Sequence, residues 1–192
     1  MPIAPFVAAV LLTGARFAEL IELDWSQVDL DALDSEGQTV GEIHVTAATT
    51  KTKRPRTIGL EVSPALRKLL SAMHLKGGGK GSVFRLTRDA AKTAERRLRR
   101  EFGAPAGCGW QALRRTCGTF LTNSPGVFGA ASAFRSAKQL GHSVAVAEKH
   151  YVDVLRGIPR DAKTLESAMQ IEAQMDRIVA SASTPAAVRR IG

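Results

Sequence analysis

Apolar stretches at the start of the chain are separated by one sharp break. Residues 4 to 12 are almost wholly apolar, which predicts a buried helix, and the Thr13-Gly14 pair ends it. A second helix is expected over residues 16 to 23, with Leu20 on its buried side. Because glycine permits turns that other residues resist, the break would aim Arg16 out of the core and into a cleft.

In the next part of the chain, apolar and polar residues alternate with a period of two, which predicts β-strands. The apolar positions that alternate with polar ones are Ile43, Val45, Ile58, Leu60 and Val62. Residues 49 to 56 lie between the two runs and are predicted to form a basic hairpin tip. A short third strand is expected at residues 82 to 86.

Helical patterns fill most of the remaining chain. Ser63 is a typical N-cap and Pro64 fits the first turn, so a helix begins there. Further helices are expected at 88–102, 110–121, 130–140, 145–154 and 161–180, with loops at 76–81 and 123–129. The last helix is amphipathic. Its apolar side carries Leu165, Met169, Met175, Ile178 and Val179.

Composition and charge favour a globular protein that binds a polyanion. The chain has 192 residues, 44% of them hydrophobic, which is enough for a core. The formal net charge is +9 and the pI is about 10.2, an excess that favours a polyanionic partner without identifying it. The two cysteines, Cys108 and Cys117, match neither a disulfide framework nor a zinc-binding spacing.

The apolar N-terminus does not have the pattern of a targeting segment. No Lys or Arg precedes Arg16, so the positive region of a signal peptide is missing. The stretch from 2 to 15 is also too short to cross a bilayer. A cytoplasmic location is therefore expected.

Five short segments carry residues suited to a phosphate site. They are Thr13 to Leu20, Thr50-Lys51-Thr52, Gln111 to Thr116, Leu140-Gly141-His142, and Tyr151, the only tyrosine. A guanidinium fork meets two phosphate oxygens at once, so Arg16 and Arg114 could neutralise a phosphodiester under attack without a metal. Tyr151 is the candidate nucleophile, and its phenol, with a pKa near ~10, needs cationic neighbours to lose its proton.

Each of these residues has a plainer explanation when it is taken singly. Arg16 could be a surface residue, and Arg114 with Arg115 a solvated helix face. His142 could be structural, and Tyr151 a core aromatic whose hydroxyl has one partner. Their order and spacing together favour the chemical interpretation.

The order Arg16, Lys51, Gln111 with Arg114, His142 and Tyr151 resembles the catalytic domain of the tyrosine recombinase (phage integrase) family, over roughly residues 5 to 155. The resemblance implies a mostly helical α+β fold with a small antiparallel three-stranded sheet. It implies site-specific DNA recombination through a 3′-phosphotyrosyl intermediate, with no metal or other cofactor. Lys51 would protonate the leaving 5′-hydroxyl, with Lys53 as its competitor, and Glu19 would orient Arg16.

The same resemblance implies double-stranded DNA as the partner, a homotetramer on that DNA, and association with the nucleoid. Residues 1–160 would form the catalytic domain, and residues 161–192 a helix and tail. That helix would dock onto a neighbouring protomer or pack on its own core. The cationic side chains expected to contact DNA are Lys53, Arg54, Arg56, Arg96, Arg97, Arg99, Arg100 and Arg115.

Two departures from the family pattern leave alternatives open. Gln111 occupies the position of a family histidine, and an amide can donate a hydrogen bond but cannot act as a general base. Such a loss typically lowers a rate by ~10²–10³-fold. The family pattern also includes an N-terminal DNA-clamping domain before the arginine motif, and this motif begins thirteen residues into the sequence given, so whether the protein has that domain stays open. The alternatives are a non-enzymatic DNA-binding remnant of a recombinase and, less favoured, a relaxing topoisomerase.

Overall fold

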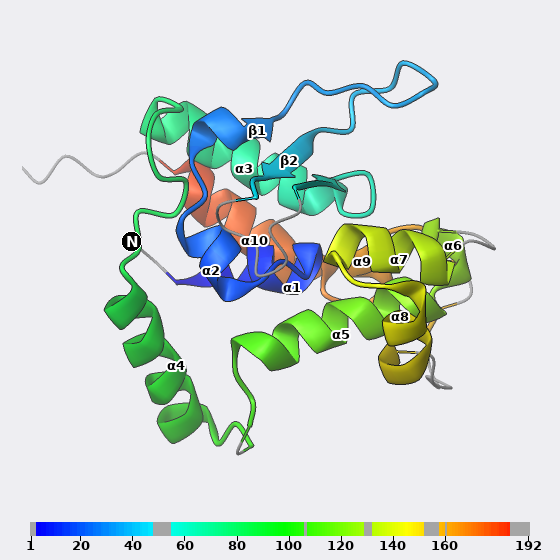
Figure 1. Ribbon diagram of the computed structural model, residues 1–192. Coiled ribbons are helices and arrows are strands. Elements are labelled where there is room, and N and C mark those ends of the chain that lie inside the picture. Colours follow the sequence, from blue (N-terminus) through cyan, green and yellow to red (C-terminus); the bar gives the residue numbers. More distant parts are fainter. Residues whose placement is uncertain are drawn as a thin grey trace, which may run out of the picture.

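The computed structural model describes residues 3–47, 55–105, 107–128, 132–151, 158–159 and 161–184. Its first half contains α1 (Ala4–Thr13), α2 (Phe17–Ile21), the 3₁₀ turn η1 (Trp25–Gln27), β1 (Val28–Asp29), β2 (Glu42–Val45), β3 (Arg56–Gly59) and α3 (Pro64–Gly77). Its second half contains α4 (Arg88–Phe102), α5 (Trp110–Asn123), α6 (Pro125–Phe128), α7 (Ser132–Leu140), α8 (Val144–Tyr151), α9 (Leu165–Ala168) and α10 (Glu172–Ser183). Figure 1 shows the small sheet at the top of the molecule and most of the helices below it.

The predicted α+β class, mostly helical with a small antiparallel sheet, is confirmed. The sheet has the order β1-β2-β3, and both strand pairs are antiparallel. Ile43 in the middle strand lies opposite Val28 and Ile58, so the predicted alternation places apolar side chains on the inner face. His44, between the buried Ile43 and Val45, points to solvent.

The third strand is not where the sequence placed it. Residues 82 to 86 form only an isolated bridge, Asp24 with Ser82, and the third strand is β1. Val83 and Phe84 are apolar because they are buried in the core, and Arg85 has a positive φ of 43° that interrupts extended backbone. The apolar pattern was therefore a sign of burial, not of strand pairing.

Helix α1 is the buried helix that the sequence predicts. Its Phe6 ring makes edge-to-face contacts with Phe17, Phe84 and Trp110, with centroids 5.2 to 5.7 Å apart. These contacts join α1 to α2, to the 82–86 segment and to the start of α5. Among the described residues, no helix is long and apolar enough to cross a membrane.

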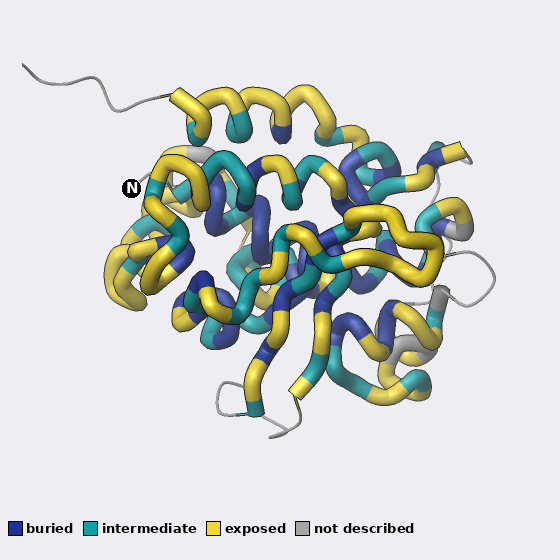
Figure 2. The backbone as a smooth tube through the Cα atoms, turned by 90° about the horizontal axis from the view of Figure 1, so that it is seen from above, coloured by how far each residue is buried: buried dark blue, intermediate teal, exposed yellow. Residues whose placement is uncertain are grey.

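The C-terminal helix is broken where one continuous helix was expected. Gln170 adopts a left-handed φ of 57°, so α9 ends and α10 starts in a new direction. Glu166 on α9 accepts a hydrogen bond from Ala65 N at the start of α3, at 2.8 Å, which ties α9 to α3. Leu165 and Met175 belong to the same core as α1, and α10 lies along α3 with its outer side exposed (Figure 2).

Two further elements complete the comparison with the predicted pattern. Residues 125 to 128 of the expected 123–129 loop form the short helix α6. Helix α4 occupies the predicted range and stands at the edge of the body (Figure 1). Among its residues whose burial is described, Ala91 alone is buried. Its basic side chains are therefore exposed to solvent.

Candidate functional site

The turn after α1 can be made only by glycine. Gly14 has a φ of 62°, which is unfavourable for other residues. A Cβ there would lie 2.3 Å from Leu140 Cδ2 and 3.0 Å from Cys117 Sγ. The end of α1 therefore packs directly on α5 and α7, and Arg16 follows two residues later at the start of α2.

Arg114 joins this turn to a second one. Its side chain is buried and donates from Nη1 to the carbonyl of Gly14 and from Nη2 to the carbonyl of Leu140, at 2.6 Å in the latter case. The acceptors are 100 and 26 residues away in the sequence. The solvated-face interpretation therefore fails for Arg114, whereas its neighbour Arg115 is exposed.

Glu19 connects two arginines. Its carboxylate accepts from Arg16 N at 2.7 Å and from Arg16 Nη1 at 3.0 Å. It also accepts from both terminal nitrogens of Arg56, at 2.9 and 2.7 Å. Burial alone would raise the pKa of Glu19, but the bonds and charge of Arg56, with those of Arg16, outweigh it and hold the pKa below 4.5. Glu19 is therefore a buried carboxylate that orients both guanidinium groups.

Arg56 has a position that the sequence analysis missed. It was assigned to DNA contact on the hairpin tip, but its side chain is only 8% exposed and lies in the ion pair with Glu19. Its Nε donates to Gln139 O at 2.9 Å. A usable signal was present, because Arg56 has the same parity as Ile58 and Leu60 and so faces inward with them.

His142 lies where these groups meet. Gly141, with a φ of 71°, ends α7, and a Cβ there would approach Arg56 Cδ to 2.9 Å. The Nδ1 of His142 is 3.1 Å from Ser143 O, and since a carbonyl only accepts, the pairing assigns the proton to Nδ1. Burial lowers the pKa of His142 below 6.5, and the positive charges of Arg114, Arg16 and Arg56 lower it further, against the bond to Ser143.

We call Arg16, Glu19, Arg56, Arg114 and His142 the cationic cluster. Its three guanidinium groups and one carboxylate give the cluster a formal charge of +2 when His142 is neutral. The Arg16 side chain is 26% exposed, whereas Glu19 and Arg56 lie behind it. An anion can therefore reach Arg16 while the buried arginines supply a fixed positive field.

Gln111 is placed by the start of α5. It is exposed, is the second residue of α5 and precedes Arg114 by about one turn. Its neighbour Trp110 stacks on Phe17, with centroids 5.6 Å apart, and Phe17 directly follows Arg16. Packing between α2 and α5 thus brings the start of α5 toward Arg16.

Four of the remaining candidate side chains lie outside the part of the chain that the structure describes. Lys51, Lys53 and Arg54 lie outside the described residues, as does the side chain of Tyr151. Tyr151 is the last residue of α8, which starts two residues after His142 and packs on α5 and α7, the helices that carry Arg114 and lead to His142. The expectations for these side chains therefore remain predictions.

The arginines of α4 are exposed and are not joined to the cationic cluster by the contacts described for them. Arg97 pairs with Glu101, at 2.8 Å, and Arg99 with Glu95, at 2.5 Å, both one turn away on the same helix. Arg100 lies 3.7 Å from Glu101, and Arg99 also donates to Cys108 O. Such exposed pairs add little stability and leave the helix cationic on balance.

No family model matches the chain, and no match is found among the curated proteins or the solved structures. The functional assignment therefore depends on the site's own residues and geometry.

Proposed function

We propose that this protein cleaves and rejoins DNA strands with Tyr151 as the nucleophile, in site-specific recombination of the tyrosine recombinase type. The observation that carries the proposal is the meeting of Arg16, Arg114 and His142 in one cluster from segments far apart in the sequence. Their residue types suit a phosphate, and perturbed ionisable groups gather at functional sites more often than elsewhere.

The proposed reaction breaks one bond to phosphorus for the one that it forms. The Tyr151 oxygen attacks phosphorus, a 3′-phosphotyrosyl bond forms, and the bond from phosphorus to the 5′-oxygen breaks. The tyrosine loses a proton and the departing 5′-oxygen gains one, for which Lys51 is the proposed donor. A 5′-hydroxyl from another strand reverses the step, so no ATP is consumed.

The cationic cluster would stabilise the transition state through charge that is already in place. A phosphodiester gains negative charge on its non-bridging oxygens as it is attacked, and a fixed guanidinium lowers the energy of that state without reorganising. Arg16 would contact those oxygens, since it is the partly exposed member. Glu19 would prevent Arg16 from turning away, because it holds both its main chain and its Nη1.

His142 would take part as a neutral imidazole. A lowered pKa keeps the ring uncharged near neutral pH, and the proton on Nδ1 makes Nε2 the basic nitrogen. It could then accept the proton of Tyr151 or, once protonated, donate to a phosphate oxygen.

A nicked suicide DNA substrate tests the proposal. Cleavage releases a short fragment, so religation fails and the covalent protein–DNA adduct accumulates. Wild type should form the adduct, and Tyr151→Phe should not, although it should bind DNA with nearly the same affinity. If neither wild type nor Gln111→His forms an adduct on substrates that it binds, the non-enzymatic DNA-binding alternative is the better account.

A further inference from the structure

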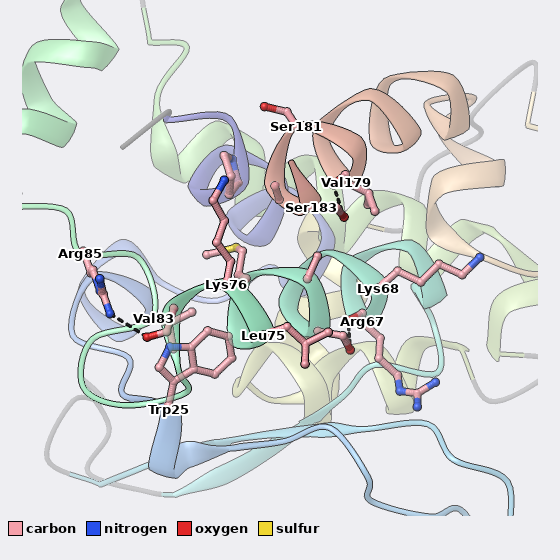
Figure 3. Close-up of a pocket in the computed structure, with 16 residues that line it drawn as sticks. Trp25, Arg67, Lys68, Leu75, Lys76, Val83, Arg85, Val179, Ser181 and Ser183 are labelled. Carbon is pink, nitrogen blue, oxygen red and sulfur yellow. Dashed lines mark hydrogen bonds between the residues drawn. The ribbon is translucent and has the colours of Figure 1, made fainter. Parts of the chain in front are cut away.

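A groove of about 1010 Å³ runs along α3 and is also lined by the end of α10, by Trp25 and by residues 83 and 85, away from the cationic cluster (Figure 3). Pro5, near the start of α1, lines the groove, whereas Gly14, at its other end, belongs to the turn before Arg16. A helix of this length spans about 15 Å, so the groove and the cluster are separate.

The lining of the groove is cationic. It includes Arg67, Lys68, Lys76 and Arg85, and no Asp or Glu. Three of them donate to neutral carbonyls: Arg67 to Leu30 O at 3.1 Å, Lys76 to Thr184 O at 2.6 Å and Arg85 to Gly77 O at 3.0 Å. Within the described residues, none of the four forms an ion pair. Their positive charge is therefore available to a partner.

The groove also has apolar contact surface. Leu75 on α3 is 84% exposed, and Figure 3 shows it on the side of the helix away from α10, between Trp25 and Arg67. Trp25, Val83 and Val179 line it as well. A fitting partner therefore combines carboxylates with an aliphatic side chain.

The chain itself contains such a segment. The acidic loop, residues 29 to 36 between β1 and β2, reads Asp-Leu-Asp-Ala-Leu-Asp-Ser-Glu. No Lys or Arg occurs between Arg16 and Lys51. The acidic side chains of the loop form no ion pair within the described residues, and Leu33 is 60% exposed. Figure 1 shows the β1–β2 connection projecting from the body.

The acidic loop is held in a defined shape before any binding. Asp34 accepts from Glu36 N at 2.9 Å and from Gln38 N at 2.8 Å, and Leu33 is bridged to Thr39. Little conformational entropy would be lost when such a loop docks.

We propose that two copies of this chain form a dimer in which the acidic loop of each occupies the cationic groove of the other. Within one copy the acidic loop lies next to the cationic groove, because Arg67 of the groove donates a hydrogen bond to Leu30 O in the loop. A single two-fold axis can therefore bring both loops to both grooves at once, as a self-complementary interface requires. This proposal does not depend on the DNA chemistry.

Sedimentation at several salt concentrations tests the dimer. Wild type should be dimeric in low salt at micromolar or higher concentration and should dissociate as salt rises, because the contact is between exposed charges. The loop variant Asp31→Lys/Glu36→Lys and the groove variant Lys68→Glu/Lys76→Glu should each be monomeric. Lys163→Glu/Arg177→Glu makes the same charge change as the groove variant at exposed residues outside the lining and should remain dimeric.

Mixing gives the decisive result. In an equimolar mixture the new lysines of the loop variant meet the new glutamates of the groove variant, and the native loop meets the native groove, so heterodimers should form from two monomeric variants. Restored dimers also show that both variants are folded. A wild type that is monomeric under all these conditions, or a mixture that stays monomeric, overturns the proposal. The proposal is also overturned if two results occur together: the groove variant loses DNA affinity, and the oligomeric state of the wild type does not change with salt.

Discussion

Glu19 is the residue on which the geometry of the cationic cluster depends. A carboxylate out of contact with water is unfavourable unless its charge and lone pairs are matched, and here Arg16 and Arg56 match them. Of the two partners, Arg56 provides a fork with both terminal nitrogens, whereas Arg16 contributes one guanidinium nitrogen and its main-chain N–H. Arg56 thereby leaves part of Arg16 available to a ligand.

Removal of Arg56 should therefore destabilise the fold. Arg56→Ala leaves the buried Glu19 half-paired, so the free energy of unfolding should fall by about 3–5 kcal/mol in urea titrations. Arg97→Ala removes an arginine–glutamate pair that is exposed, and it should change the free energy of unfolding little. The destabilisation should shrink as the pH falls below 4.5, where Glu19 becomes protonated. Equal effects of the two variants would show that the buried pair contributes no more than a surface pair.

His142 offers a direct probe of the field in the cluster. In NMR titrations of the free protein its imidazole should have its midpoint below 6.5, since burial and the three arginines disfavour the imidazolium. Arg16→Ala removes one of those charges and should raise the midpoint. Added inorganic phosphate should also raise it, because an anion favours the protonated ring. A midpoint at or above 6.5 without ligand would contradict the described arrangement.

Gln111 can be tested with little risk to the fold, because it is exposed. If it holds a phosphate oxygen through its amide, Gln111→Ala should slow cleavage by about 1–3 kcal/mol of transition-state stabilisation. Gln111→His should leave the rate equal or higher, since it adds a proton-transfer group. Single-turnover cleavage of the suicide substrate measures both. No effect of Gln111→Ala, with cleavage abolished in Arg16→Ala, would place Gln111 outside the site.

At the level of elements, two glycine turns and one arginine assemble the cluster. The turns after α1 and α7 approach each other closely, and Arg114 on α5 joins their carbonyls. This close approach explains why Gly14 and Gly141 stand at the two bends. The sequence already indicated a turn or a helix end at each of these glycines. What the sequence could not give is the partner of each arginine, since those contacts join residues up to 100 positions apart.

If the protein binds DNA as proposed, the exposed basic helix α4 is expected to contact it through charge. Arg96→Glu/Arg100→Glu should weaken DNA binding and reduce the slope of log K against log salt, because fewer counterions are released. Lys163→Glu/Arg177→Glu, which changes the net charge by the same amount at exposed residues outside α4, is the control. Fluorescence anisotropy over a salt series measures both quantities. An unchanged slope would place α4 away from the DNA.

Sequence patterns predicted most elements because those patterns have local causes. The Ser63 N-cap, the alternation at Ile43 and Ile58 and the apolar face of α10 all appear where they were expected. The failures came from tertiary contacts. Val83 and Phe84 are apolar because they are buried in the core, and the backbone turns at Gln170, between α9, which Glu166 ties to α3, and α10.

Over the whole molecule, positive and negative charge are segregated. Residues 17 to 50 contain acids and no Lys or Arg, in a chain whose net charge is +9. Residues 49–56 and α4 are basic. On the two proposals, the acidic loop would therefore face a second copy of the chain and not DNA, which would leave the basic segments to the DNA.

The most direct test of the central claim is the identity and polarity of the covalent link. A suicide substrate labelled at the 5′ end of the cleaved strand should transfer its label to the protein, because a 3′-phosphotyrosyl bond retains the upstream fragment. Proteolysis and mass spectrometry should then find the nucleotide on the peptide that contains Tyr151, the only tyrosine. A link to any other residue, or transfer of the strand with the 3′ label, would contradict the proposed chemistry.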